Sequence, residues 1–260
     1  MKQRVITAFV LIAILAPILY FGGIAFWVLA VVLGLISANE MIKITEKSWP
    51  VSFQLISYVM VLAVIFSNLG GMQYFFLVDV LILIILFAML IFNEKVQFAD
   101  IGVMFMYYNI IGMMIGGFTR FYEISNMMPF YMAFATCVTD AGAYFAGRLF
   151  GKHKLNERIS PKKTIEGSVG GFILGAVISF VFGYFTLYVK GLVPISFLIV
   201  GSLTMCVIGQ IGDLAFSAIK RHYGIKDFGS LFPGHGGVLD RIDSISFNTM
   251  WLYVLMLVML

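Results

Sequence analysis

The chain has 260 residues and a formal net charge of +4, and it is 61% hydrophobic with only 12% charged residues. A soluble domain usually has about 25% charged and about 45–50% apolar residues, so this composition excludes an ordinary water-soluble protein. Repeated apolar runs of about 18 or more residues predict membrane-spanning helices, because about 20 helical residues cross the hydrocarbon core. A transmembrane β-barrel would show short alternating strands instead. We therefore expect an all-α, polytopic integral membrane protein.

Hydropathy predicts about nine transmembrane helices. The first apolar run, after MKQR, is followed by a second apolar run and not by a cleavage site with a polar region, which indicates a retained helix and not a signal peptide. Cys137 and Cys206 lie inside apolar runs and are interpreted as small buried side chains, not as a disulfide or a metal pair. The expected spans are 5–21, 24–42, 51–67, 74–92, 101–118, 127–148, 168–189, 193–217 and 244–260.

The basic residues indicate the orientation. With a cytoplasmic N-terminus, all of the 17 Lys and Arg residues except Arg120 and Lys190 fall on the cytoplasmic side, as the positive-inside rule expects. Two long polar loops, 149–167 and 218–243, then lie on that face. We expect two regions: N-terminal transmembrane helices for packing and lipid access, 1–120, and a C-terminal catalytic region that carries both loops, 121–260.

Carboxylates inside apolar spans are the first candidates for function, since such charges are costly and usually face a bundle interior or a wet cavity. Asp79 has no basic partner close in sequence and is assigned an interhelical hydrogen bond. Asp140 lies ~12 Å along its span from the cytoplasmic end, at ~1.5 Å per residue, and Asp213 lies at a similar or shallower depth. If the helix of Asp213 continues, Ser217 and Lys220 share its face.

Two further acids, Asp240 and Asp243, are spaced i and i+3 at the start of the last span, where a helix N-terminus favours anionic side chains. We expect them to meet Asp140 and Asp213 near one level of the membrane. Because four uncompensated carboxylates would repel one another, the cluster predicts a bound cation. All-oxygen ligands favour Mg²⁺, Mn²⁺ or Ca²⁺ over zinc or copper.

Basic and glycine-containing segments, GKHKLNERISPKKTIEG and KRHYGIKD, flank these acids. Attraction to anionic lipid head groups explains clustered Lys and Arg, but it does not explain the interleaved acids and glycines. Cations for phosphates, carboxylates for a metal and glycines for close backbone approach together favour a site for a polyphosphate and a metal ion. Ser160 or Thr164 is expected to cap the following helix and to donate to a phosphate, although the order is not that of a Walker A motif.

The segment 217–243, SAIKRHYGIKDFGSLFPGHGGVLDRID, resembles the signature of the phosphatidate cytidylyltransferase (CDP-diacylglycerol synthase) family. TDAGAYFAGRLFGKHKL, ISPKKTIEG and GDL upstream are also similar, and together these segments cover about a third of the chain. Phe216 departs from the pattern, because family members often carry an acidic residue just before the signature serine. The matching positions are Ser217, Lys220, Arg221, Lys226, Asp227, His235, Gly236, Gly237, Asp240, Arg241 and Asp243.

The resemblance implies transfer of a cytidylyl group from CTP to phosphatidate, with CDP-diacylglycerol and pyrophosphate as products. It implies Mg²⁺ or Mn²⁺ as cofactor, with room for a second metal ion. Asp213 and Asp240 are the expected main metal ligands, and Asp243 and Asp140 are further ligands or supports. Catalytic roles are expected for Asp213, Lys220, Asp240, Arg241 and Asp243. Substrate binding is expected for Ser160, Lys162, Lys163, Thr164, Ser217, Arg221, Lys226, Asp227, His235, Gly236 and Gly237.

Two alternatives stay open at this point. A CTP-dependent kinase of a polyprenol or another lipid alcohol needs similar metal and triphosphate chemistry, but its hydroxyl acceptor must lose a proton. A transporter also places carboxylates in the membrane, though more often at the midplane and between repeated halves. The expected partners are CTP, phosphatidate and membrane lipids, without nucleic acid, and the resemblance suggests a homodimer. The expected location is the cell (inner or plasma) membrane, with the active site and the N-terminus on the cytoplasmic side.

Overall fold

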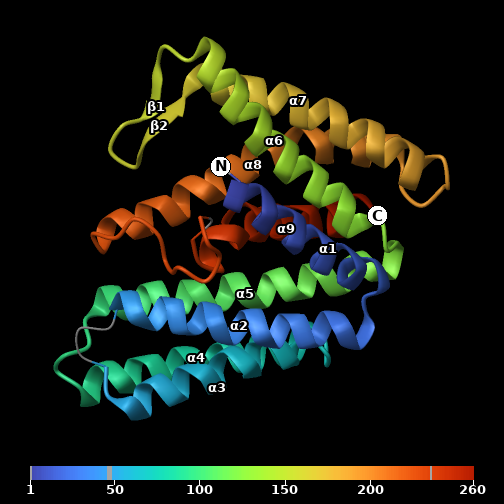
Figure 1. The fold of residues 1–260 in the computed structure, drawn as a ribbon. Helices are drawn as coiled ribbons and strands as arrows, with labels where there is room; N and C mark the ends of the chain where they lie inside the picture. Colours follow the sequence, from blue (N-terminus) through green and yellow to red (C-terminus); the bar gives the residue numbers. More distant parts are fainter. Residues whose placement is uncertain (1, 46–48, 235) are drawn as a thin grey trace. The chain divides into compact units, whose positions relative to one another are not determined.

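The computed structural model describes residues 2–45, 49–234 and 236–260, and these residues form nine α-helices (Figure 1). Each helix overlaps one of the nine predicted apolar segments, so the helical architecture agrees with the prediction. The helices are α1 (Lys2–Phe21), α2 (Gly23–Thr45), α3 (Val51–Ser67), α4 (Met72–Phe92), α5 (Phe98–Ile124), α6 (Met128–Phe150), α7 (Ile165–Gly183), α8 (Ile195–His222) and α9 (Leu239–Met259).

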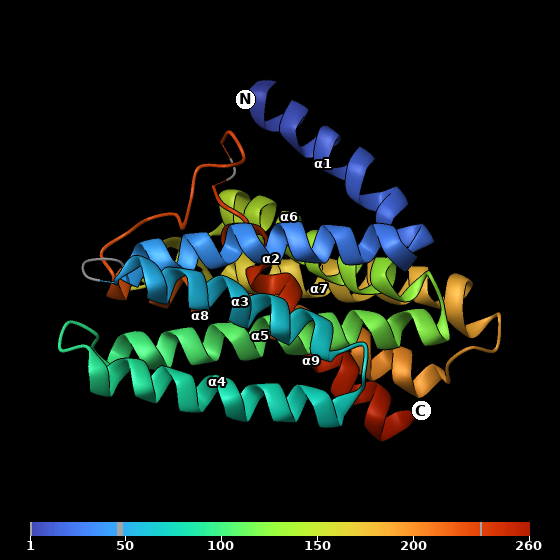
Figure 2. The same cartoon turned by 90° about the horizontal axis from the view of Figure 1, so that it is seen from below.

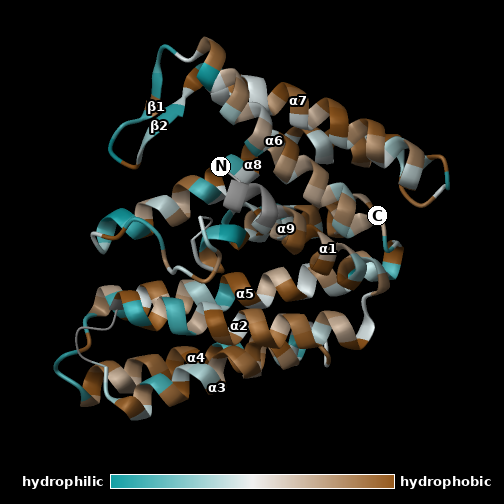
Figure 3. Cartoon of the chain, viewed as in Figure 1, coloured by the Kyte–Doolittle hydropathy of each residue, from teal (hydrophilic) through white to brown (hydrophobic). Residues whose placement is uncertain are grey.

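Six of the described helices are long and apolar enough to cross a membrane, judged by length and composition. Helices α1 and α3 contain shorter apolar stretches, Phe9–Phe21 and Val51–Ser67. Hydrophobic residues extend along most helices, whereas hydrophilic residues gather on the β-hairpin and near the end of α8 (Figure 3). The chain is therefore a multi-pass, largely helical membrane protein, while a total of nine spans stays a prediction.

The polar loop 149–167 is not irregular, as the all-α prediction implied, but contains an antiparallel hairpin of β1 (Lys154–Asn156) and β2 (Ser160–Thr164). Strands this short leave no recognisable alternation in the sequence. The Glu166 carboxylate stabilises the base of the hairpin, because it accepts backbone hydrogen bonds from Lys152 (3.0 Å) and His153 (3.2 Å). The His153 ring also contacts it, with 2.6 Å between Nδ1 and Oε1.

The chain packs as two compact units, and the signature segment is divided between them. Unit 1 comprises Met1–Ile18, Gly22–Thr119 and Asp227–Asp240, and unit 2 comprises Leu19–Phe21, Arg120–Lys226 and Arg241–Leu260. The loop 227–240 thus packs with the N-terminal helices, whereas the rest of α9 packs with α6 and α8.

In unit 1, helices α2 to α5 run side by side (Figures 1 and 2). The hydroxyls of Ser37 and Tyr107, 2.8 Å apart, join α2 to α5. Asn109 Nδ2 donates to Asp79 Oδ1 at 2.8 Å and joins α5 to α4. The interhelical hydrogen bond predicted for Asp79 is therefore present, and it satisfies a carboxylate that would otherwise be costly in an apolar span.

In unit 2, glycines bring the helix backbones into close contact. A Cβ atom at Gly171 of α7 would lie 2.5 Å from the carbonyl oxygen of Thr139 on α6, and one at Gly142 would lie 3.1 Å from the Gly171 Cα. Gly212 of α8 has the same role toward α9, since its Cβ would lie 2.7 Å from the Asp243 carbonyl oxygen. Small residues permit such approach where lipid gives no hydrophobic driving force for association. These contacts fix the spacing of the helix backbones that carry Asp140, Asp213 and Asp243.

We predict that Gly171→Ala lowers the thermal stability of the detergent-solubilised protein, by about 1–3 kcal/mol as is typical of overpacking. The new methyl group would meet backbone atoms of α6, which cannot rotate away. Gly102→Ala on α5 is the matched control, because a Cβ there meets nothing within 4 Å. Equal thermal unfolding of the two variants would contradict the close α6–α7 packing.

Candidate active site

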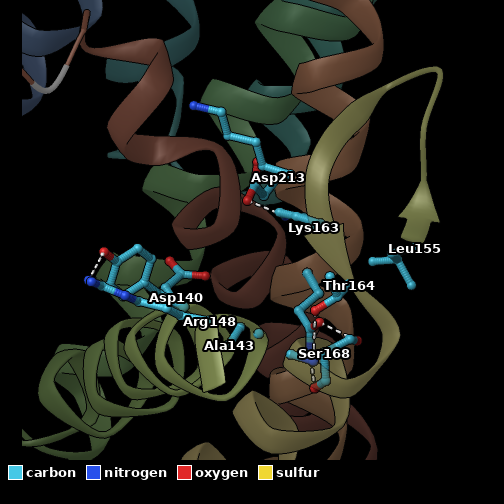
Figure 4. A pocket seen from close by; sticks show the side chains of 13 residues that line it. Asp140, Ala143, Arg148, Leu155, Lys163, Thr164, Ser168 and Asp213 are labelled. Carbon is cyan, nitrogen blue, oxygen red and sulfur yellow. Dashed lines mark hydrogen bonds and ion pairs between the residues drawn. The ribbon is translucent and has the colours of Figure 1, made fainter. Parts of the chain in front are cut away.

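A cavity of 380 Å³ lies in unit 2, where the hairpin approaches α6, α7 and α8 (Figure 4). Its wall combines three cationic side chains with two carboxylates, which is the mixture expected for a polyphosphate and a cation. The lining residues are Asp140, Ala143, Tyr144, Gly147 and Arg148 of α6, Leu155 of β1, Lys162, Lys163 and Thr164 of β2, Gly167 and Ser168 of α7, and Gln210 and Asp213 of α8.

Asp213 connects the hairpin to α8. Lys163 reaches from β2 and forms an ion pair with Asp213 Oδ2 (Figure 4). The other carboxylate oxygen, Oδ1, accepts a hydrogen bond of 3.3 Å from the Ser217 hydroxyl one turn later on α8. The shared helix face predicted for Asp213 and Ser217 is therefore present. Three residues predicted to bind metal or substrate meet at this point.

Three of the four predicted metal-binding acids form one electrostatic cluster. Asp140 and Asp243 both lie close enough to Asp213 for their negative charges to repel it. Arg241 provides an opposing positive charge to Asp140 and Asp243, and Lys220 provides one to Asp243. Among the residues that the structure describes, no three Asp, Glu, His or Cys side chains are arranged as a metal centre. The cluster thus has carboxylates of the predicted type, and metal binding by them stays a prediction.

Asp240, the fourth acid, organises the signature loop in unit 1. Its side chain is buried, and Oδ2 accepts hydrogen bonds from the backbone N–H groups of Phe228 (2.8 Å) and Gly237 (2.9 Å). Gly236 has a φ of +84°, and a Cβ there would lie 2.7 Å from the same oxygen, so both the conformation and the space favour glycine. His235 lies outside the described residues.

The residues predicted on the hairpin lie at different places relative to the cavity. Lys162 lines it and is exposed. Thr164 lines it too and caps α7, since its hydroxyl oxygen accepts a hydrogen bond of 3.1 Å from the Gly167 N–H. Of the two predicted caps, Ser160 and Thr164, the structure therefore shows Thr164 as the N-cap of α7. Ser160, at the first position of β2, is not among the cavity-lining residues.

The basic residues at the end of α8, Lys220, Arg221 and His222, are not among the cavity-lining residues. Arg221 donates to the backbone carbonyl of Ile159 at 3.2 Å and to that of Ile225 at 2.8 Å, and so ties the end of α8 to the hairpin turn. Lys226 and Asp227 are exposed where the chain leaves unit 2 for unit 1. The substrate-binding roles assigned to Arg221, Lys226 and Asp227 stay predictions.

Several cavity residues were missed in the sequence. Gln210 and Ser168 bind each other across α8 and α7, with the Ser168 hydroxyl donating to Gln210 Oε1 at 2.5 Å. Tyr144 and Arg148 line the α6 side, one helical turn apart. The available signals in the sequence were polar side chains in the apolar run GQIGDL and in the small-residue run before GRLFG. Such a side chain can serve packing or function, and the sequence does not show which residues contact it.

Phe216 does not line the cavity. It is 2% exposed, and its ring packs edge-on against Phe247 of α9, with 6.5 Å between the ring centroids. The residue that departs from the family pattern therefore contributes to the α8–α9 core in this chain. A carboxylate at this position would be buried against an aromatic ring.

The fold and the cavity together define a multi-pass membrane protein with a cavity that combines Lys and Arg side chains with carboxylates. The model of the "Cytidylyltransferase family" matches residues 2–259. A phosphatidate cytidylyltransferase of Staphylococcus haemolyticus is 34% identical over 100% of both chains, and one of Staphylococcus aureus (strain COL) is 33% identical over 99% of both. The chain belongs to the cytidylyltransferase family, which confirms the resemblance of segment 217–243.

We predict that Phe216→Asp, which introduces the acid common in the family, lowers thermal stability, because it buries a charge and removes the contact with Phe247. Phe216→Leu is the control, since it keeps an apolar side chain and should cost less. Unfolding temperatures of the two purified variants in detergent provide the measurement. An aspartate variant as stable as the unchanged chain would show that the helices readily adapt to an acid here.

Proposed function

We propose that the protein transfers the cytidylyl group of CTP to phosphatidate, forming CDP-diacylglycerol for phospholipid biosynthesis and releasing pyrophosphate. The observation that carries the proposal is a cavity with three cations and two carboxylates in a chain that belongs to the cytidylyltransferase family along its whole length. Relatives that share this length are phosphatidate cytidylyltransferases. An activity that joins two phosphate-bearing substrates suits a cavity whose wall carries three cationic side chains.

In the proposed reaction, a phosphate oxygen of phosphatidate attacks the α-phosphorus of CTP. The bond between this phosphorus and the bridging oxygen breaks, and pyrophosphate leaves with the electron pair. The attacking phosphate is already an anion, so no general base is needed to form the nucleophile. The task of the protein is to bring two anions into line and to neutralise the departing charge. Lys162, Lys163 and Arg148 are suited to this task, because they line the cavity.

We propose that a divalent cation, Mg²⁺ or Mn²⁺, binds at the electrostatic cluster of Asp140, Asp213 and Asp243. Asp140, Asp213 and Asp243 offer the carboxylate oxygens that such hard cations prefer. When bound, the cation would neutralise triphosphate charge and stabilise the leaving group. Lys163 holds Asp213 through an ion pair, so we propose that it exchanges this carboxylate for a substrate phosphate. We propose further that Asp240 is a ligand of the cation and that a second metal ion binds.

We place this site at the cytoplasmic face of the cell membrane. The basis is the distribution of Lys and Arg, which puts the hairpin and the end of α8 on the side with most of the positive charge. Phosphatidate then enters with its acyl chains in the inner leaflet and its phosphate at the level of the hairpin. A homodimer, suggested by the family resemblance, is part of the proposal and is tested by the mass of the purified protein in detergent.

We predict that the purified protein, supplied with phosphatidate, Mg²⁺ and CTP labelled in the cytosine ring, transfers the label to the lipid and releases pyrophosphate. A chelator should abolish both products, and added Mg²⁺ or Mn²⁺ should restore them. A lipid kinase would instead move the γ-phosphate label and leave the cytosine label in solution. Folded protein that gives no labelled lipid would refute the proposed reaction.

We predict that Asp213→Asn reduces CDP-diacylglycerol formation by about 10²-fold or more, the scale on which loss of an electrostatic stabiliser acts. The amide keeps the size of the side chain but removes the charge that attracts Lys163 and a cation. Asp79→Asn is the matched control, because Asp79 bonds Asn109 in unit 1 and not the cavity. Its turnover should stay close to that of the unchanged chain. Normal turnover in Asp213→Asn would remove Asp213 from the reaction.

A further inference from the structure

Glu40 is a buried carboxylate of α2 that binds the start of α9. Glu40 is only 5% exposed. Oε1 accepts a hydrogen bond from the backbone N–H of Val238 and Oε2 accepts one from Leu239, both at 2.9 Å. The donors lie almost 200 residues further along the chain but within the same compact unit. Glu40 therefore holds a segment of the family signature from a distant helix.

Two glycines of the loop leave the space that the Glu40 carboxylate occupies. A Cβ at Gly229 would lie 2.5 Å from Glu40 Oε1, and one at Gly237 would overlap the same oxygen. Any larger residue at either position would displace the carboxylate or the loop. The structure thus gives Gly237, a signature residue, a packing role against Glu40.

The bond to Leu239 falls at the first residue of α9. The first N–H groups of a helix have no partner within the helix, and a negative charge beside them is stabilising. Glu40 supplies both the acceptor and the charge from α2. Asp240 supplies a second acceptor to the same loop, because its Oδ2 accepts hydrogen bonds from the backbone N–H groups of both Phe228 and Gly237. Two carboxylates therefore organise the loop 227–240, one from within it and one from outside.

We propose that Glu40 is a positioning residue for the reaction: it sets the conformation of loop 227–240 and of the first residues of α9, and through them the placement of Asp240. This inference rests on the proposed cytidylyl transfer. Glu40 acts through the loop and not by contact with substrate. Without its carboxylate, two buried N–H groups lose their acceptors, which is costly enough to shift the loop.

The test is Glu40→Gln, which keeps the size of the side chain but turns an NH₂ group toward one of the two N–H donors. We expect turnover per folded protein to fall by about 10- to 100-fold, as when supporting residues around a catalytic site are lost. Peptides covering 227–240 should exchange deuterium faster than in the unchanged chain. Asp79→Asn, the same chemical change on α4, should alter neither quantity.

A second variant, Gly229→Ala, pushes on the carboxylate from the loop and should reproduce both effects with Glu40 intact. If Glu40→Gln does not fold, Gly229→Ala alone tests the positioning role of Glu40. Unchanged turnover or unchanged exchange in a folded variant overturns the inference. If the unchanged chain forms no CDP-diacylglycerol, the proposed reaction fails, whereas the exchange comparison still shows whether Glu40 holds the loop.

Discussion

The ion pair between Lys163 and Asp213 joins the β-hairpin to α8 and forms one wall of the cavity. The hairpin strands are too short to be stable alone, so their position depends on contacts at their ends. Glu166 holds the base through the backbone of Lys152 and His153, Arg221 holds the turn through Ile159, and Asp213 holds β2. Asp213 is also one of the two carboxylates that line the cavity, so the contact that positions the hairpin uses a charged group of the cavity wall.

The carboxylates of this chain fall into two groups according to what they bind. Asp79, Glu40 and Asp240 accept hydrogen bonds from amide N–H groups, which are fixed in place by helices and a loop. Asp213 binds the side chains of Lys163 and Ser217, which can move. Asp243 is intermediate, since its Oδ1 accepts a hydrogen bond of 2.8 Å from the Ser244 backbone N–H while the charges of Lys220 and Arg241 lie near it. A buried carboxylate must be satisfied in either way, but only the second kind can exchange its partner at low cost. The distinction is therefore one of mobility: Asp79, Glu40 and Asp240 bind groups that the fold holds in place, whereas Asp213 binds side chains that can rotate.

Sequence patterns were sufficient for the helices and for much of the cavity. Nine apolar runs indicated nine helices, the spacing of Asp213 and Ser217 indicated a shared face, and ISPKKTIEG indicated a capped helix start. These features depend on residues close in sequence. The hairpin was missed because its strands are only three and five residues long. Glu40 was missed because its position near Lys43, at the end of an apolar run, suggests an ordinary span terminus, and its partners lie in a distant loop.

The start of α9 is bound by a carboxylate of α2, almost 200 residues earlier in the chain. The first residues of α9 pack with unit 1, and the residues from Arg241 onward pack with unit 2. Asp240 and Asp243 lie one turn apart on this single helix, so the local spacing of the two acids is set by helical geometry. In unit 2, Gly212 brings the Asp243 backbone close to α8. In unit 1, Glu40 accepts a hydrogen bond from Leu239, and Asp240 accepts one from Gly237. The N-terminal helices, assigned only packing and lipid access from the sequence, thereby contribute to the geometry of the signature motif.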